Sequence, residues 1–344
     1  LAASRPQDPV SALAWPVLDH SERPRVEKAR RRGRGRERGG IRAEIHDAAE
    51  CLATHERAQG NNLRTLQRAV QFGAAATLAY VQALIGDTPL DDRSPGLLVM
   101  SERRRSDLAR ASERSLERIL DRFEDWLGDR VGALIDAGEP LIDGERPLTA
   151  SEDVRTVTRV FQKINKKREK RQMIAPTDAD VKQRIQFWRE VKIRDESLSA
   201  GRRLGRALVL AHRREVEGTP REFVTALSRR AGLLFPPFGG RALQKRLKPS
   251  VLMLDTLVRA CVPAGRILPL DEFLERLWRR FGLIVGGRRS PSWDDAELLE
   301  RHDLHVDPHD LSSNTELFVD ELASMGLARR FPDDVAFIGD GYDR

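Results

Sequence analysis

The sequence predicts a mainly α-helical protein of several domains. Apolar residues recur at three- and four-residue steps over long stretches, which is the spacing of one helix face. Strand-like patterns are short and lie near the C-terminus. The chain has 344 residues, of which 40% are hydrophobic. That is enough for two or three domains with cores of their own, and it excludes a wholly disordered chain.

Residues 1–40 are predicted to form a flexible basic arm. Prolines recur there, and the stretch 23–38 (RPRVEKARRRGRGRER) holds nine basic and two acidic residues with glycines between them. No periodic apolar face runs through this region, so we do not expect it to pack as a helix.

Residues 41–150 are predicted to form a helical domain. A turn-rich break at 86–96 separates two long helices, and the second ends at Gly138. This second helix has the clearest amphipathic pattern, with apolar residues from Leu108 to Ile135 and charged residues on the other face. The first helix carries one apolar stripe, which consists of Leu63, Leu66, Val70, Ala74, Leu78, Val81 and Ile85.

Residues 151–249 are predicted to form a basic helical region. Helices are expected from Ser151, after a cap at 177–180, over 198–217 and over 220–231, with a Pro- and Gly-rich break at 236–240.

Residues 250–344 are predicted to form an acidic domain. Helices are expected over 250–262, 270–281 and 311–325, with a short strand in 282–287. Two short β runs, 327–331 and 335–339, then surround a tight turn. Helices followed by a small hairpin resemble a winged-helix domain over about residues 250–339. The resemblance implies a fold for this region and names no family for the whole chain.

The net charge of +7 conceals a strong separation of charge. The stretch 155–250 holds 25 basic and nine acidic residues, whereas 291–344 holds four basic and 14 acidic residues. Cations placed against phosphates release counterions, so a basic surface binds polyanions. Because aromatic residues there mostly occupy apolar-face positions, we expect contact with a duplex backbone, DNA rather than RNA, and not stacking on single strands.

The candidate nucleic-acid contacts come from the arm and from three stretches of the basic region. They are Arg30, Arg31, Arg32, Arg34, Lys163, Lys166, Lys167, Lys170, Arg171, Arg202, Arg203, Arg206, Lys245, Arg246 and Lys248.

The third helix of the winged-helix-like region is not expected to read DNA. It carries Glu316, Asp320 and Glu321, which would face the phosphates of a bound duplex. Only the stretch 312–314 (SSN) and the pair Arg329-Arg330 are compatible with DNA. We therefore expect this region to dock a protein partner.

No catalytic residues or cofactor are predicted. The sequence lacks the P-loop, HExxH, GxSxG and CxxC patterns. His302, His305 and His309 lie among aspartates and are candidate metal ligands, but nothing in their spacing fixes a geometry. A polar surface connection is the preferred interpretation of this stretch.

A cytoplasmic location is expected. Two cysteines, 210 positions apart, indicate a reducing compartment, and no signal peptide is visible. The most apolar run, 72–86, is too short to cross a bilayer. The chain begins with Leu1 and not with Met, which indicates a fragment or a processed product.

The leading hypothesis is a non-enzymatic nucleic-acid-binding subunit of a larger bacterial complex, with other protein subunits as partners. Genome defence is one context in which such subunits work. Three alternatives stay open: a protein-interaction scaffold that assembles through acidic and basic faces, a metal-dependent nuclease that uses 300–310, and a winged-helix transcription regulator. The last alternative requires Asn314 to contribute to sequence-selective DNA binding.

Overall fold

The computed structural model describes residues 40–59, 61–84, 93–101, 106–139, 197–215, 219–236, 245–290, 293–331 and 335–341. These residues are mainly α-helical, which confirms the predicted fold class. The predicted arm and the helices predicted from Ser151 and after 177–180 lie outside the described residues. Two compact units are present, one from the described parts of Leu1–Ile119 and Val224–Arg344, the other from those of Leu120–Phe223.

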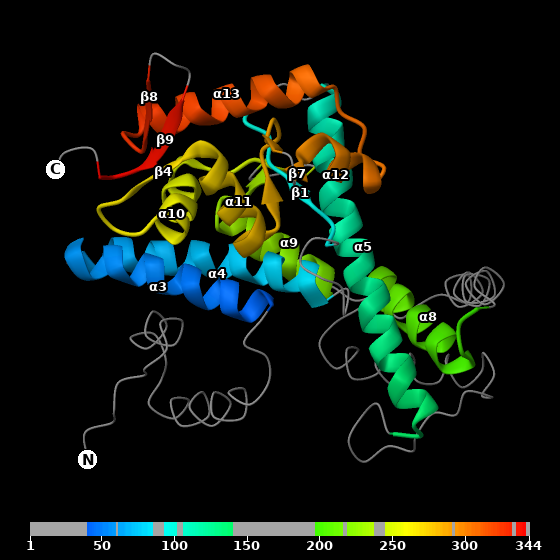
Figure 1. The fold of residues 1–344 in the computed structure, drawn as a ribbon. Coiled ribbons are helices and arrows are strands. Elements are labelled where there is room, and N and C mark those ends of the chain that lie inside the picture. Colours follow the sequence, from blue (N-terminus) through cyan, green and yellow to red (C-terminus); the bar gives the residue numbers. More distant parts are fainter. Residues whose placement is uncertain are drawn as a thin grey trace, which may run out of the picture. The chain divides into compact units, whose positions relative to one another are not determined.

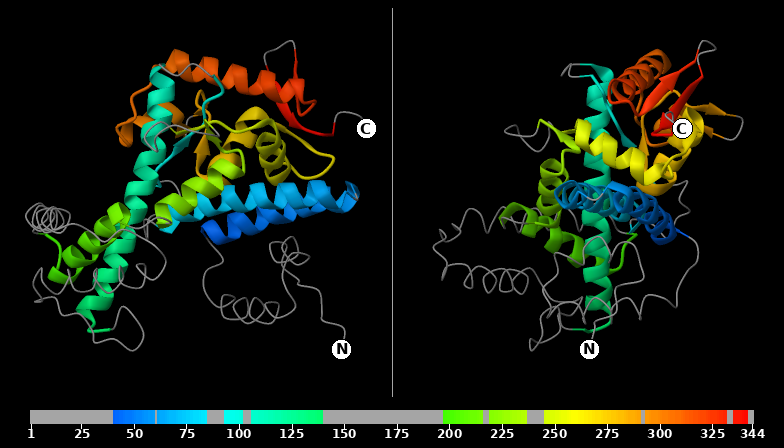
Figure 2. Two further views of the ribbon diagram at one scale, coloured as in Figure 1. Left: turned by 180° about the vertical axis from the view of Figure 1, so that it is seen from behind. Right: turned by 90° about the vertical axis from the view of Figure 1, so that its left-hand side faces the viewer.

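Helices of the first unit lie in layers. The helices α3 (Ile41–Gln59) and α4 (Asn62–Leu84) run side by side and pack against α10 (Val251–Cys261) and α11 (Leu270–Phe281). On the other side of α10 and α11 lies α13 (Pro308–Ser324), as Figures 1 and 2 show. The helices predicted at 250–262, 270–281 and 311–325 are therefore present, and the first two pack on helices from the predicted N-terminal domain.

A three-stranded antiparallel sheet lies at one end of this unit. Its strands are β4 (Ile267–Pro269), β8 (Ala328–Arg330) and β9 (Ala336–Gly339), in the order β4-β9-β8. The strands β8 and β9 form the predicted hairpin. The three residues of β4 are too few to show an alternating pattern, so the sequence does not predict this strand.

Short strands join distant parts of the chain near the start of α5 (Asp107–Asp136). The strand β1 (Gly96–Leu97) pairs in parallel with β5 (Leu283–Ile284), and β2 (Leu234–Phe235) pairs with β3 (Arg246–Leu247). Two serines of α5 complete the hydrogen bonds: Ser112 Oγ donates to Leu97 O at 2.7 Å, and Ser115 Oγ accepts from Leu97 N at 3.1 Å. Buried backbone groups of β1 are thereby satisfied.

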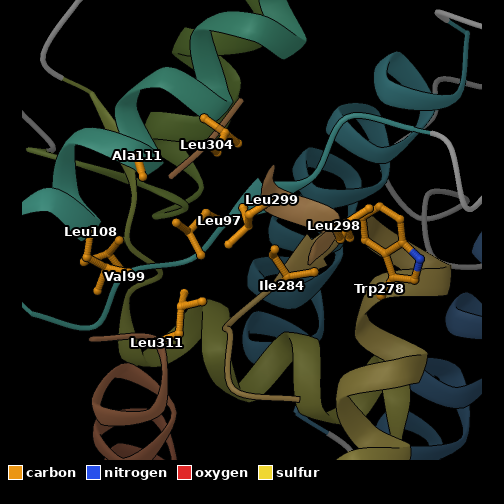
Figure 3. Close-up of a cluster of buried hydrophobic side chains, with 10 residues drawn as sticks. All are labelled: Leu97, Val99, Leu108, Ala111, Trp278, Ile284, Leu298, Leu299, Leu304 and Leu311. Atoms are coloured by element: carbon orange, nitrogen blue, oxygen red, sulfur yellow. The ribbon is translucent and has the colours of Figure 1, made fainter. Parts of the chain in front are cut away.

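An apolar core surrounds these strands (Figure 3). It receives side chains from β1, α5, α11, β5 and α13, and from α12 (Asp295–Arg301), which follows the hairpin of β6 (Arg289–Ser290) and β7 (Trp293–Asp294). Leu97 and Ile284, from the two paired strands, lie in the middle of the cluster. The members of the cluster are Leu97, Val99, Leu108, Ala111, Trp278, Ile284, Leu298, Leu299, Leu304 and Leu311.

The second unit contains the C-terminal half of α5, the helix α8 (Ala200–Glu215) and the start of α9 (Pro220–Arg230). Glycines at four-residue spacing let α5 and α8 approach closely, Gly128 and Gly132 on one helix and Gly201 and Gly205 on the other. A Cβ at Gly201 would lie 2.7 Å from Gly132 O, and a Cβ at Gly205 would lie 2.5 Å from Gly132 N. The contact is therefore backbone against backbone.

The apolar stripe predicted on α4 is only half correct. Ala74, Leu78 and Val81 are buried, whereas Leu63 is 66% exposed and Val70 is 50% exposed. In the first turns of α4 the buried face is rotated toward Arg68 and Gln71, which are 2% and 7% exposed. Among the described residues, no helix has both the length and the apolar composition that a bilayer crossing requires.

Candidate functional site

A cleft runs along one side of α13 in the first unit. Its volume is about 550 Å³, a size typical of ligand-binding clefts. The lining comes from the stretch after β1, from the start of α5 and from one stripe of α13. The lining residues are Met100, Ser101, Ser106, Leu108, Asp310, Ser313, Asn314, Glu316, Leu317 and Asp320.

Asn314 attaches α13 to the floor of this cleft. Its side chain is 1% exposed. Its Nδ2 donates to Leu98 O at 2.8 Å and to Val285 O at 2.7 Å, and its Oδ1 accepts from Met100 N at 2.9 Å. These are the chain segments that continue β1 and β5. The backbone at the bottom of the cleft is therefore preorganised by these three hydrogen bonds.

The position of Asn314 corrects one sequence-based expectation. A buried carboxamide whose NH₂ group and oxygen are bonded to backbone atoms cannot also contact a base edge. Asn314 therefore does not serve as the base-reading residue that the transcription-regulator hypothesis requires.

A close approach of backbone to helix holds α13 in place beside Asn314. Gly286 has φ +101°, and a Cβ at this position would lie 3.0 Å from Leu311 Cβ. The hydroxyl of Thr315 donates to Gly286 O. Both the left-handed conformation and the lack of space require glycine here.

The stripe of α13 that faces the cleft is acidic. Glu316 and Asp320 lie one turn apart, and Asp310 lies two turns before Leu317, which also lines the cleft and is 46% exposed. Asp320 forms a surface ion pair with Arg330 of β8 at 3.0 Å. Within the described part of the chain, no ion pair involves the carboxylate of Asp310 or of Glu316. The cleft thus combines negative charge with an exposed apolar side chain.

The basic residues predicted in 198–217 lie on α8 in the second unit. Arg202 is exposed, and Arg203 is half-buried. Arg206 forms a bidentate pair with Asp129 of α5, with Nε–Oδ1 at 2.8 Å and Nη2–Oδ2 at 3.1 Å. The planar guanidinium of Arg206 is already bound to a carboxylate. Of these three arginines, Arg202 is therefore the one whose side chain is exposed to solvent.

Two of the three basic residues predicted near 245–248 are buried in the first unit. Lys245 is 4% exposed, and its Nζ donates to Pro236 O at 2.6 Å. Burial, together with the nearby charge of Arg229, lowers the pKa of Lys245. Lys245 is therefore enclosed by the protein, and in this structure it cannot contact a phosphate.

Arg246 has a similar structural position on β3. It is 1% exposed, and its guanidinium lies 5.0 Å from the ring centroid of Phe235. Its charge also reaches Glu113 of α5, where burial raises the pKa of the carboxyl and Arg246 opposes that rise. Lys248 is half-buried, with Nζ at 5.2 Å from the same Phe235 ring. Arg246 is too deeply buried to contact a phosphate, and the side chain of Lys248 is only partly exposed to solvent.

The other predicted nucleic-acid contacts lie outside the described residues. They are Arg30, Arg31, Arg32, Arg34, Lys163, Lys166, Lys167, Lys170 and Arg171.

One aromatic side chain of the basic region departs from its expected position. Most aromatic residues of this region are expected at apolar-face positions, but Phe223 is 61% exposed. A single exposed ring does not form a stacking platform for successive bases, so it does not by itself favour single-strand binding.

The three candidate metal-ligating histidines do not form a preorganised site. His302 ends α12 and is half-buried, while His305 and His309 are exposed. Within the described part of the chain, the ligand atoms of one group lie within 4.8 Å of one another, and this group is His46, Asp47 and Glu50 on α3. All three of its members are exposed, a common arrangement that does not indicate a bound metal.

The two cysteines come close to one guanidinium despite their separation in sequence. Arg280 Nη1 lies 3.6 Å from Cys51 Sγ, and the charge of Arg280 also acts on Cys261. Cys261 is fully buried, and burial raises its pKa to about 12. The thiolate form of Cys261 is therefore strongly disfavoured, which makes this thiol a poor nucleophile.

A buried network of charges between α3, α4 and α10 was not predicted. Arg68 donates from Nη1 to Glu56 at 2.8 Å and from Nε to Asp255 at 2.7 Å. Asp255 also accepts from Arg259 Nε at 2.8 Å. Burial alone lowers the pKa of Arg68, but the hydrogen bonds and charges of Glu56 and Asp255 outweigh it and raise that pKa. The sequence feature that could have predicted this network is Arg68, a charged residue at a core-facing position of α4.

Comparison of the chain with protein-family models, with curated proteins and with solved structures gave no match.

Proposed function

We propose that the protein is a non-enzymatic subunit that holds a nucleic-acid duplex, DNA in preference to RNA, through its basic region and docks a protein through its winged-helix-like C-terminal region. The observation that carries this proposal is the separation of charge. The stretch 155–250 has 25 basic and nine acidic residues, against four basic and 14 acidic residues in 291–344. A duplex backbone is attracted to the first stretch and repelled by the second.

The described residues support a nucleic-acid interface with fewer basic residues than the sequence predicts. Arg202 on α8 and Arg230 at the end of α9 are exposed. Lys245 and Arg246 are buried, so they contribute to folding and not to phosphate contact. Arg206 is bound to a carboxylate and therefore contributes less to phosphate contact than an exposed arginine does. The polyanion-binding residues of this proposal are therefore Arg202 and Arg230, together with the basic residues of 155–196, which lie outside the described part of the chain.

The acidic face of α13 supports a docking role for the C-terminal region. In this region α10, β4 and α11 come first, then three short strands with α12, and then α13 and the hairpin β8–β9, with β4 as the third strand of the sheet. This order supports the winged-helix proposal. The side of α13 that lines the cleft carries the exposed Glu316 and Asp320 and the half-buried Asp310, and its amide Asn314 is buried. Such a helix would repel a duplex and is better suited to a protein partner.

A salt titration of duplex binding tests the proposed function. Binding of a fluorescein-labelled DNA duplex to the full chain, followed by fluorescence anisotropy, should be tight at low salt and weaken steeply as salt rises. Duplex RNA and single-stranded DNA in parallel titrations should bind more weakly. Absence of duplex binding at low salt would exclude the proposal.

A second candidate function is a protein-interaction scaffold that assembles through acidic and basic faces. The cleft along α13, with two carboxylates that have no ion-pair partner among the described residues, favours it. Sedimentation velocity at low and high salt distinguishes the two. A scaffold of this kind forms oligomers that dissociate at high salt without nucleic acid, whereas the leading proposal predicts a sedimentation coefficient that does not change with salt.

A further inference from the structure

The cleft along α13 has the chemistry of a binding site for a cationic peptide segment. Carboxylates form their strongest hydrogen bonds with the forked guanidinium of arginine. The exposed side chain of Leu317, which is 46% exposed, offers an apolar surface for the aliphatic part of an arginine side chain. The bonds of Asn314 to three backbone groups hold the floor of the cleft, so binding requires little reorganisation of the protein.

The negative charge of the cleft is only partly compensated by the described residues. Asp320 pairs with Arg330 at the surface, where such a pair contributes little and exchanges readily. The carboxylates of Asp310 and Glu316 form no ion pair with any described residue. A segment that brings several arginines would complete the charge balance.

The chain contains a segment of this kind near its start. The stretch 23–38 holds nine basic and two acidic residues, among them the run Arg30-Arg31-Arg32. It ends two residues before Gly40, where the described part of the first unit begins. Arg30-Arg31-Arg32 lies eight to ten residues before Gly40, and Lys28 lies 12 residues before it. An extended chain therefore places the arginines within roughly 26–36 Å of Gly40 and Lys28 within roughly 40–43 Å, which is comparable to or larger than the ~30 Å diameter of a small domain. The tether therefore allows the segment to reach the cleft of the same unit.

We propose that the cleft along α13 is the docking site of the arginine-rich stretch 23–38 of the same molecule. Covalent attachment gives the segment a high effective concentration at the cleft, so modest contacts suffice. The proposal goes beyond nucleic-acid binding and does not depend on it. If a polyanion is present, it competes with the cleft for the same arginines.

Cross-linking of the full chain tests where the stretch lies. Lys28 is within it, and no other lysine precedes Lys163. A zero-length carbodiimide reagent joins a lysine amine to a carboxylate that it contacts. Peptide mapping by mass spectrometry should find Lys28 joined to Asp310, Glu316 or Asp320. Glu297 and Glu300 on α12 are exposed carboxylates outside the cleft, and they should give few cross-links.

A charge-neutral variant makes the test specific. In Asp310→Asn/Glu316→Gln, the cross-link from Lys28 to the remaining Asp320 should fall about fivefold to tenfold, as expected for the loss of two ion pairs. Trypsin should also cleave after Arg30, Arg31 and Arg32 faster than in the unaltered chain. The matched control Glu297→Gln/Glu300→Gln removes the same charge from α12 and should change neither measurement.

Three results would overturn the proposal. The first is the absence of Lys28 cross-links to the cleft, or cross-links spread equally over Glu297 and Glu300. The second is a cross-link between labelled and unlabelled chains in a mixture with ¹⁵N protein, because the occupant would then be a second copy. The third is a gain of Lys28 cross-links only after neutralisation of the sequence-adjacent Arg103, Arg104 and Arg105, because those arginines would then occupy the carboxylates.

Discussion

Single buried polar side chains link elements of the first unit that are distant in sequence. Asn314 links α13 to the chain after β1 and to the chain after β5 with three hydrogen bonds. Arg68 likewise links α3, α4 and α10 through two carboxylates. Because these groups are buried, removal of one partner leaves the others with fewer hydrogen bonds and no water to replace them, which is more costly than loss of a surface contact.

Replacement of Asn314 tests this role. Asn314→Ala leaves Met100 N, Leu98 O and Val285 O without their side-chain partner, so the free energy of unfolding should fall by about 2–5 kcal/mol. Urea denaturation followed by circular dichroism measures the change. Ser313→Ala on the adjacent, partly open position should change it by less than ~0.5 kcal/mol. A loss of similar small size for Asn314→Ala would contradict the structural role.

The raised pKa of Cys261 predicts that the folded protein loses stability in alkaline solution. Its pKa is about 12 in the folded protein and 9.0 in the reference state. Because the folded pKa is raised, the folded state holds its proton between these values while the unfolded state loses it. The contribution of Cys261 to stability is therefore complete below about pH 9 and is lost as the pH rises toward about 12.

The measurement compares the unaltered chain with Cys261→Ala. From neutral pH to about pH 10.5, ionisation of this thiol in the unfolded state should remove about 2 kcal/mol of stability from the unaltered chain. The alanine variant should show a correspondingly flatter dependence over the same interval, whatever its stability at neutral pH. Identical slopes for the two proteins would show that the thiol ionises as easily when folded.

At the scale of helices, the contact between α5 and α8 depends on glycines. Gly205→Ala would place a Cβ 2.5 Å from Gly132 N, against the backbone of the opposite helix. A Gly→Ala replacement in a helix ordinarily stabilises by ~0.5–1 kcal/mol, but here the steric overlap should reverse the sign and destabilise by about 1–3 kcal/mol.

Gly73→Ala on α4 is the matched control, since a Cβ at Gly73 meets nothing within 4 Å. Thermal unfolding followed by circular dichroism should show a higher midpoint for Gly73→Ala and a lower one for Gly205→Ala. Stabilisation by both replacements would indicate that the two helices do not pack closely in solution.

The helices were largely predictable from the sequence, whereas their buried faces were less so. The long amphipathic pattern of α5 and the apolar runs of α10 and α11 are local signals, and the structure confirms the helices that they predict. On α4, periodicity selected a stripe that includes Leu63 and Val70, which are exposed. The true face includes Arg68 because partners on α3 and α10 compensate its charge, and such partners are distant in sequence.

The pairing of β1 with β5 and the cleft depend on contacts between segments that are distant in sequence, so no local pattern predicts them. The pairing of β1 with β5 joins residues that are nearly 190 positions apart, over two residues each. Asn314 was noted as a polar residue near a helix start, but its three backbone partners lie on other segments. The acidic character of α13 was predictable, because charge is a property of the sequence itself.

For the whole molecule, the net charge of a stretch overstates its attraction for a polyanion, because burial and ion pairing remove cations from the surface. Arg202, Arg206 and Arg246 all belong to the basic stretch 155–250, yet they are exposed, bound to Asp129 and buried, respectively. The salt dependence of duplex binding counts only the cations that contact phosphates.

The three arginines should therefore change the salt dependence of duplex binding to different extents. Arg202→Gln should reduce the slope of log K against log salt by about 0.9, the value for one phosphate contact. Arg206→Gln should change it less, and Arg246→Gln should leave it unchanged while lowering the thermal unfolding midpoint. Anisotropy titrations at several salt concentrations, at a temperature where circular dichroism shows each variant folded, measure the slopes. Equal changes for all three would mean that Arg246 becomes exposed when the duplex binds, and the division of the basic residues into structural and phosphate-binding sets would be wrong.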